Sequence, residues 1–332
     1  MSAQRQGIIC AGNWILDLIH DIPYWPAKSD LIEIASQTAG IGGGAGNVSL
    51  DLAALKVGYP IIPMGCVGDD AYGETVLQIC RAAGLWVDYM QVIAGTPTAH
   101  THVMNIPGDS RTFFYSGGVN DLLDEGHFPV TGISGADPKV FYLGYLNLLP
   151  RLDRVDSTGT TGAARLLARA RAAGMMTCVD LVSTQSESYA QTVKATLPEI
   201  DWLFLNEVEA ARATGITAKD EADRDSLLQA ADTLLAAGLR QGCVIHSPRL
   251  SLWRTRTATV WRDFAPLPKD QIKSAVGAGD AFATGILHGL HEGWPPQDCL
   301  DLGHKAACAC LRLPTASGGL PPLQDLQIGD QK

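Results

Sequence analysis

Short apolar segments alternate with amphipathic segments along most of the chain. The apolar segments predict strands at 7–11, 61–66, 140–146, 177–182, 202–205 and 243–246. The amphipathic segments predict helices at 47–56, 74–83, 188–197 and 225–237, and another that ends near Gly174. In the first of these helices, apolar residues recur at Val48, Leu52 and Leu55, and Gly58 can end the helix. This alternation predicts a mostly parallel sheet with helices on both faces.

Two stretches depart from this pattern and predict a second, smaller sheet. Leu31–Thr38 and Thr98–Ser116 alternate apolar and polar positions, and the second contains the turn sequence Pro107-Gly108-Asp109. We therefore expect a small antiparallel sheet that stands apart from the main one. At the other end of the sequence, Leu323–Lys332 is expected to be a loose tail.

Composition and charge exclude several classes of protein. Of the 332 residues, 46% are hydrophobic and 18% are charged, which is typical of a globular chain rather than a disordered one. The 25 basic and 35 acidic residues give a net charge of −10, which argues against a nucleic-acid-binding protein. Apolar runs fall short of the ~18 residues that span a bilayer, and Met1–Gln6 lacks a signal-peptide pattern, so we expect a cytoplasmic protein with no membrane partner. The eight cysteines include no Cys-x-x-Cys pair and are expected to be free thiols.

A glycine-rich segment at 40–47 is the first candidate for ligand binding. It matches the dinucleotide-binding pattern G-x-G-x-x-A, but the next strand ends at Met64-Gly65-Cys66, without the acidic residue that would hold a ribose. Two interpretations remain open. The bare backbone and the Asn47 amide can approach a polar ligand, or the glycines can form a tight turn between strand and helix.

The strongest chemical signal is the segment Gly277–Gly285, in which small residues open an apolar helix. Small residues there leave backbone N–H groups accessible, and the helix dipole adds positive potential, so the helix start can bind an anion. Asp280 lies beside this anion site. Phosphoryl transfer needs both parts, because the phosphate requires donors and the attacking hydroxyl requires a base. A plain helix cap would explain Asp280, but not the small residues Gly277, Ala278 and Gly279 before it.

These motifs resemble those of the ribokinase-like carbohydrate kinase family, also called the phosphofructokinase-B (PfkB) family. Gly277–Asp280 matches the C-terminal Gly-Ala-Gly-Asp quartet of that family, and Gly42–Asn47 with Gly65–Gly73 is similar to its N-terminal signature. A third element, N-x-x-E, is present at Asn206–Glu209 directly after a predicted strand. The resemblance covers nearly the whole chain.

The resemblance implies a single domain over residues 1–332, with a three-layer α/β/α core. A β lid formed by about 17–40 and 96–118 would be inserted into this core, and in the family the lid often also forms the contact of a homodimer. The resemblance further implies ATP and Mg²⁺ as cofactors and transfer of the γ-phosphate to a small-molecule sugar.

The family roles carry over to individual positions of this chain. Asp280 would be the general base, and the amides of 277–279 would form the anion hole. Asn206 and Glu209 would position Mg²⁺ and its waters against the nucleotide phosphates. The acceptor-binding residues would be Asn13, Asp17, Gly43 and Asn47.

Three further residues each have two interpretations. Arg111 lies on a lid strand and either faces the acceptor or is an ordinary solvated residue. His304 lies in the final helix, where the family binds adenine, and is either a nucleotide contact or a core or surface histidine. Ser247–Ser251 replaces the Gly-x-x-Gly loop of the family; Pro248 removes a backbone donor there, and Arg249 could contact a phosphate instead.

A second departure concerns monovalent cations. Ser274-Ala275-Val276 stands where many members have Asp-Thr-Thr, whose aspartate belongs to a cation site, so we expect activity independent of K⁺. Other polar clusters give no comparable signal. His100 and His102 lack a third ligand nearby for a metal, and the histidines at 288 and 291 are expected at the surface.

We therefore expect an ATP- and Mg²⁺-dependent kinase that phosphorylates a hydroxymethyl group of a sugar. Two alternatives stay open. The acceptor could be a nucleoside that stacks on an aromatic residue such as Trp14 or Tyr115. The chain could also be a sugar- or nucleotide-sensing protein without turnover, although a pure binding protein would not need the base Asp280.

Overall fold

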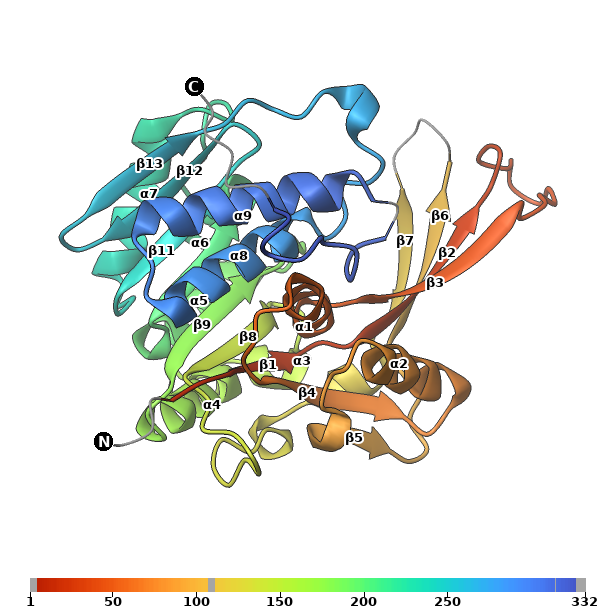
Figure 1. The fold of residues 1–332 in the computed structure, drawn as a ribbon, viewed down its shortest axis with the longest axis horizontal. Coiled ribbons are helices and arrows are strands. Elements are labelled where there is room, and N and C mark those ends of the chain that lie inside the picture. Colours follow the sequence, from red (N-terminus) through yellow and green to blue (C-terminus); the bar gives the residue numbers. More distant parts are fainter. Residues whose placement is uncertain (1–4, 107–110, 314, 327–332) are drawn as a thin grey trace.

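The computed structural model describes residues 5–106, 111–313 and 315–326. Its largest element is a nine-stranded sheet (Figure 1). In spatial order its strands are β13 (Thr259–Asp263), β12 (Leu250–Thr255), β11 (Gly242–His246), β10 (Trp202–Asn206), β9 (Met176–Leu181), β8 (Val140–Leu146), β1 (Ile8–Gly12), β4 (Ile61–Gly68) and β5 (Met90–Ile93). All pairs from β11 to β5 are parallel, and β12 and β13 add an antiparallel edge. The prediction of a mostly parallel sheet is confirmed.

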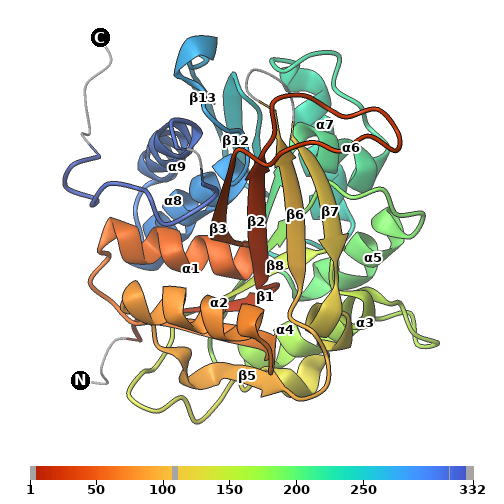
Figure 2. The same cartoon turned by 90° about the vertical axis from the view of Figure 1, so that its right-hand side faces the viewer.

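Helices cover both faces of this sheet (Figures 1 and 2). One face carries α1 (Gly44–Leu55), α8 (Ala278–Glu292) and α9 (Pro296–Leu311). The other carries α4 (Gly162–Ala172), α5 (Tyr189–Thr196), α6 (Glu207–Thr214) and α7 (Arg224–Ala236). The remaining helices are α2 (Ala71–Ala82), α3 (Pro150–Asp153), η1 (Val87–Tyr89), η2 (Gly118–Leu122), η3 (Glu125–His127), η4 (Leu197–Glu199) and η5 (Lys269–Gln271). The expected three-layer α/β/α core is confirmed.

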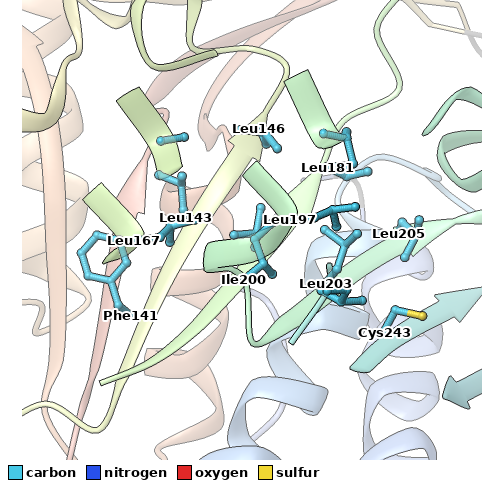
Figure 3. Close-up of a cluster of buried hydrophobic side chains, with 14 of the residues drawn as sticks. Phe141, Leu143, Leu146, Leu167, Leu181, Leu197, Ile200, Leu203, Leu205 and Cys243 are labelled. Carbon is cyan, nitrogen blue, oxygen red and sulfur yellow. The ribbon is translucent and has the colours of Figure 1, made fainter. Parts of the chain in front are cut away.

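Alternating side chains of each central strand explain the two helical layers. In β8, Phe141 and Leu143 join the apolar cluster on the α4–α7 face, whereas Val140 and Tyr142 join the cluster under α1, α8 and α9. Figure 3 shows part of the first cluster, where Leu203 of β10 lies among side chains from the neighbouring strands and helices. Each fully buried side chain of this kind stabilises the fold by about 1.5–3 kcal/mol relative to an exposed one.

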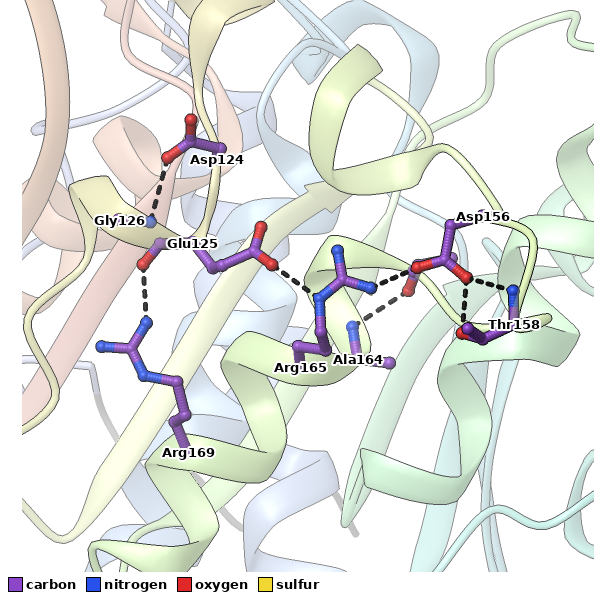
Figure 4. A network of polar contacts seen from close by, with 9 residues as sticks. Asp124, Glu125, Gly126, Asp156, Thr158, Ala164, Arg165 and Arg169 are labelled. Atoms are coloured by element: carbon purple, nitrogen blue, oxygen red, sulfur yellow. Dashed lines mark hydrogen bonds and ion pairs between the residues drawn. The ribbon is translucent and has the colours of Figure 1, made fainter.

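A polar network on the surface fixes α4 to the preceding loop (Figure 4). The Arg165 guanidinium donates to Glu125 Oε1 at 2.6 Å and to Asp156 Oδ2 at 2.5 Å. Arg169, one turn further along α4, donates to the Glu125 carbonyl at 2.8 Å. Because these groups are largely exposed, each ion pair contributes about 1 kcal/mol or less, and the apolar layer beneath dominates.

The smaller sheet stands to one side of the core (Figure 1), and its strand order is β3-β2-β6-β7 (Figure 2). Its strands are β2 (Ile15–Asp21), β3 (Ser36–Gly42), β6 (His100–Asn105) and β7 (Thr112–Ser116). The pairs β2–β3 and β6–β7 are antiparallel, as expected, and β2 joins β6 in parallel. We call this sheet the lid. The turn expected at Pro107-Gly108-Asp109 lies outside the described residues.

The lid strand expected at Leu31–Thr38 begins later than the pattern predicts. The strand starts at Ser36, because its pairing partner β2 ends at Asp21, which lies opposite Ser36. Strand β2 was not predicted, because its polar residues Asp17 and His20 interrupt the apolar run.

Three other expectations can be compared with the structure. The histidines at 288 and 291 are buried rather than exposed, because α8 lies between the sheet and α9; His291 Nε2 accepts the Gly7 N–H at 2.9 Å. The expected loose tail is packed where it is described: the Leu323 N–H donates to the Leu55 carbonyl at 2.9 Å, and Leu326 is buried. All eight cysteines are free thiols, as predicted. In the described ranges, every helix is too short or too polar to cross a membrane.

Candidate active site

The helix start at Gly277 is the centre of the site. Gly277 has φ +82°, and a Cβ there would lie 1.9 Å from the Ala316 carbonyl oxygen, so only glycine fits. No side chain caps the first turn of α8. Ala278 and Gly279, the next two residues, line a cavity of about 390 Å³. The helix start therefore offers N–H donors and the positive end of the helix dipole to an anion in this cavity.

Asp280 lies in the same turn, and its carboxylate has two different sides. Oδ2 accepts the Asn47 amide N–H at 2.8 Å and the Tyr145 hydroxyl at 2.6 Å. Oδ1 is buried and has no hydrogen-bond partner among the described residues. The residue as a whole is 4% exposed. One oxygen thus fixes the orientation of the carboxylate, and the other can accept a proton or a hydrogen bond from a bound hydroxyl.

The environment of Asp280 raises the pKa of its carboxylate toward the pH at which a general base works. Burial raises its pKa to about 6, although the hydrogen bonds from Tyr145 and Asn47 lower it. The negative charges of Glu209 and Asp17 raise it further. A base with a pKa near the working pH is well matched to removing a proton from an attacking hydroxyl.

The glycine loop places Asn47 next to this carboxylate. Gly43 has φ +84°, and a Cβ there would lie 2.5 Å from the Asn13 carbonyl oxygen. A Cβ on Gly42 would lie 2.4 Å from Asp17 Oδ2. The loop therefore has glycines because it packs closely against Asn13 and against Asp17 of β2, which supports the tight-turn interpretation. The loop also positions a group that can bind a ligand: Asn47 Oδ1 is buried and has no hydrogen-bond partner among the described residues.

Asp17 and Arg111 lie on the lid face that is turned toward this site. Burial raises the pKa of Asp17 to about 6, while a hydrogen bond from Thr101 and the charge of Arg111 lower it. Arg111 Nε donates to Asn105 Oδ1 at 3.1 Å. The charges of Asp21 and Asp17 act on the guanidinium, and burial lowers its pKa. Arg111 is thus integrated into a polar group on the lid rather than solvated alone.

Asn13 has a structural role instead of the expected acceptor contact. It is fully buried, and its side chain is used at both ends. Asn13 Oδ1 accepts the Tyr145 N–H at 2.6 Å, and Nδ2 donates to the Leu148 carbonyl at 2.8 Å. Asn13 therefore holds the segment that carries the Tyr145 hydroxyl. Tyr145 was missed by the sequence reasoning, because nothing near it in sequence marks it as polar and functional.

The Asn206–Glu209 pair forms a helix capping box at the start of α6. Asn206 Oδ1 accepts the Glu209 N–H at 2.8 Å, and Glu209 Oε2 accepts the Asn206 N–H at 2.9 Å. Ser183 Oγ donates to Glu209 Oε1 at 2.8 Å. The N-x-x-E spacing thus has a structural explanation of its own. Asn206 also lines the cavity that Ala278 and Gly279 line, so the start of α6 borders the same cavity as the anion hole.

Asp180 is a third buried acid in this region, and the sequence reasoning missed it. It lies near the end of β9, and burial together with the charges of Asp280 and Glu209 raises its pKa well above the ordinary value. Burial also raises the pKa of Glu209. Three buried carboxyl groups that oppose each other's ionisation favour a cation, and oxygen ligands suit Mg²⁺. Within the described ranges no three such groups converge on one point, so an ion here would need water or phosphate oxygens as further ligands.

The cavity beside the anion hole has an aromatic end. The His304 ring stacks on Phe264 with centroids 3.7 Å apart and planes 5° from parallel, and both line the cavity. Burial lowers the pKa of His304 to about 4, so the ring is neutral. A flat, neutral, apolar surface of this kind can stack against a nucleobase. His304 lies in α9 and lines this cavity, and its contact with a nucleotide stays a prediction.

Arg249 and Trp14 lie elsewhere than expected. Arg249 does not line the cavity; it is exposed, and its Nε lies 3.8 Å from Glu221 Oε2. Trp14 is fully buried and donates its indole N–H to the Met64 carbonyl at 3.0 Å, so it cannot stack on an acceptor. Tyr115 remains available, because it is partly exposed and its row of the lid also contains Asp17.

Comparisons with known proteins identify the family of this chain. The family model described as pfkB family carbohydrate kinase matches residues 6–322. A 5-dehydro-2-deoxygluconokinase of Clostridium perfringens is 24% identical over 298 residues, which are 86% of this chain and 82% of that protein. A ribokinase of Arabidopsis thaliana is 22% identical over 334 residues, with 98% and 80% covered. Adenosine kinase 1 of Arabidopsis thaliana is 25% identical over 278 residues, with 80% and 77% covered.

Solved structures are similar over nearly the full length. Arabidopsis thaliana ribokinase, complexed with ribose and ATP, gives a TM-score of 0.77 at 20% identity and covers 97% of this chain and 98% of that one. Thermotoga maritima ribokinase gives a TM-score of 0.75 at 15% identity, with 96% and 97% covered. The ribokinase-like fold is therefore confirmed. From its two signatures, its lid and this match over most of its length, the chain belongs to the pfkB family of carbohydrate kinases.

Proposed function

We propose that this kinase transfers the γ-phosphate of ATP, with Mg²⁺, to a hydroxymethyl group of a sugar. The observation that carries the proposal is a pair of buried acceptor oxygens, Asp280 Oδ1 and Asn47 Oδ1, which have no partner among the described residues. A buried oxygen without a donor is costly, at about 1–3 kcal/mol. The hydroxyl groups of a bound sugar would supply the two missing donors.

The residues around these oxygens divide the work of the transfer. The acceptor hydroxyl would donate to Asp280 Oδ1, and as its oxygen forms the new bond to the γ-phosphorus, the proton would move to the carboxylate. The bond from the γ-phosphorus to the β–γ bridging oxygen breaks, and ADP leaves with that electron pair. The amides of 277–279 would hold the transferring phosphoryl group by donating hydrogen bonds to its oxygens.

Mg²⁺ would neutralise phosphate charge, held through water by Asn206 and Glu209 and favoured by the acid at Asp180. The lid would close over the acceptor and exclude water, which limits hydrolysis of ATP. Asp17 would bind an acceptor hydroxyl from the lid side. Arg111 lies on the same face, and the charges of Asp17 and Asp21 balance its own, so a neutral acceptor is favoured over an anionic one.

A nucleoside acceptor is the second candidate, favoured by one observation. Tyr115 pairs with Thr101, which in turn pairs with Asp17, so the three occupy one row of the lid. Tyr115 is partly exposed, and its ring could stack on a base while Asp17 binds the ribose.

A panel experiment separates these possibilities. Thermal shift is measured with ATP–Mg²⁺ and with a series of sugars and nucleosides, and each stabilising compound is then tested for ADP release in a coupled assay. We expect release of ADP with at least one neutral sugar. Release with nucleosides alone would select the second candidate. Stabilisation by sugars and ATP without any ADP release would refute the kinase proposal and indicate a sensing protein.

The lid would also form the contact of a homodimer. Trp25 and Phe114 stack with ring centroids 6.4 Å apart, and they are 51% and 52% exposed. Phe114 lies on the lid face opposite to Asp17, so a second copy could cover it without blocking the site. Sedimentation velocity should give the mass of two chains for the wild type and of one chain for Phe114→Ser. Equal masses for the two proteins would contradict the lid contact.

A further inference from the structure

His246 is an unexplained polar group inside the cavity. It is the last residue of β11, directly beside Asn206 of β10 in the sheet. Its ring lines the cavity and packs against Phe282 of α8, with centroids 4.7 Å apart. The imidazole atoms Cε1 and Nε2 lie 3.8 Å and 3.9 Å from the position that a Cβ on Gly279 would take. His246 therefore lies beside the anion hole.

His246 is partly buried, and its ring nitrogens have no hydrogen-bond partner among the described residues. They are not among the fully buried atoms that lack a partner, so the ring, which lines the cavity, can offer a nitrogen to a ligand there. A neutral imidazole carries one N–H donor and one acceptor nitrogen. Because Ala278 and Gly279 present further donors to the same space, the natural partner of all three is an anion.

The loop that follows His246 cannot supply donors of its own. The Ser247 N–H donates to the Leu250 carbonyl at 2.9 Å, and the Arg249 and Leu250 N–H groups donate to Ser247 Oγ at 3.3 Å and 3.2 Å. Pro248 has no N–H. All backbone donors of 247–250 are thus used inside the loop or missing. A polyphosphate bound in the cavity needs donors on this side from another group.

We infer that the His246 imidazole N–H binds the β-phosphoryl group of the nucleotide, in place of backbone donors from the loop after β11. The inference rests on the proposed function, because it needs a nucleotide in this cavity. The competing explanation is structural: the ring would serve only to pack against Phe282. The two explanations differ in what they predict for nucleotides of different phosphate length.

The test is isothermal titration of the full chain with ADP and with AMP. A hydrogen bond to a charged phosphate predicts that His246→Leu, which keeps the bulk of the ring but has no donor, weakens ADP binding by about ten- to a hundredfold. AMP binding should stay unchanged, because AMP has no β-phosphate. His246→Gln, which restores an N–H donor, should recover most of the ADP affinity. His304→Leu, at the stacked pair with Phe264, is the matched control and should weaken ADP and AMP binding equally.

Each other result overturns the inference. Equal loss of ADP and AMP binding in His246→Leu would assign the ring to packing, and unchanged binding of both would exclude any contact. If wild-type protein binds neither nucleotide, both the proposed function and the inference fail. If wild-type protein binds ADP and phosphorylates a sugar, and His246→Leu binds ADP with the same affinity, only the inference fails. Should the variants not fold, ¹⁵N imidazole shifts of wild-type protein serve instead. The His246 signal must then move with ADP and not with AMP.

Discussion

Replacing Tyr145 by phenylalanine tests how the structure sets the ionisation of Asp280. The substitution removes only the hydroxyl that donates to Asp280 Oδ2 at 2.6 Å. It leaves the Tyr145 backbone N–H, and thus its bond to Asn13, in place. The ring keeps its volume, so the carboxylate should retain its position through the Asn47 amide, which donates to the same oxygen. The expected effect is therefore electrostatic rather than a loss of packing.

The sign and size of the effect follow from the charged form of Asp280. A hydrogen bond to a carboxylate favours ionisation, so losing it raises the pKa from about 6. Such a bond is worth about 1.5–3 kcal/mol, and one pKa unit is about 1.4 kcal/mol, so the pKa should rise by about one to two units. Because only the ionised base can take a proton, kcat/KM falls as the pH falls through this pKa. The acid limb of the profile should therefore move upward in the variant.

The assay is kcat/KM between pH 5 and 9, with the best acceptor from the panel and saturating ATP–Mg²⁺. Wild-type activity should fall below about pH 6, and the variant should lose activity at about one to two pH units higher while approaching wild type at the alkaline end. Tyr189→Phe is a matched control, since that hydroxyl donates to the Val182 carbonyl instead. An equal loss at every pH would refute the argument, because it would indicate displacement of Asp280 rather than a change in its ionisation.

Three further predictions follow from the same geometry. Asp280→Asn should lower turnover by about 10²–10⁴, because it removes the general base. The variant should nevertheless unfold at a higher temperature at pH 8, because the pKa of Asp280 is about 6 in the native state against an ordinary 3.8, so ionisation destabilises the native state by up to about 3 kcal/mol as the pH rises through this range. A lower melting temperature would contradict this. Gly277→Ala should lose about 1–3 kcal/mol in urea unfolding and most activity, because its Cβ would overlap the Ala316 carbonyl. Rates in K⁺ and in choline should be equal, because Ser274 supplies no carboxylate; a many-fold increase in K⁺ would contradict this.

The elements that the sequence predicted well are those whose pattern matches their burial. Strand β8 was predicted with its observed bounds, because its residues other than Gly144 are hydrophobic and it lies inside the sheet, between β9 and β1. Leu31 and Ile34 misled the lid prediction, since alternation does not show where the partner strand ends, and β2 reaches only to Asp21 opposite Ser36. Strand β12 was missed because it follows β11 after only a short turn and runs back along it, which the strand–helix rhythm does not anticipate.

The candidate site was predictable where its residues are adjacent in sequence and not where they converge in space. Gly277–Asp280 forms one helix turn, so spacing alone predicts its chemistry. Tyr145 reaches Asp280 across 135 positions, and no local pattern connects them. Asn13 was misjudged for a related reason: its position near Asp17 suggested a ligand contact, whereas burial commits both ends of its amide to the backbone.

A rule about sheets could have found the missed residues. Four neighbouring strands, β8 to β11, each carry a polar side chain at or near the carboxyl end, and these are Tyr145, Asp180, Asn206 and His246. Ligands of open α/β sheets bind outside the carboxyl ends of the strands. At about 4.8 Å between strands, the row spans about 14 Å, which is enough for a phosphoryl acceptor at one end and a polyphosphate along the rest. On the proposed function, the base would lie over the β8 end and the nucleotide would extend toward β11, so a polar residue that ends a predicted apolar strand is the signal to seek.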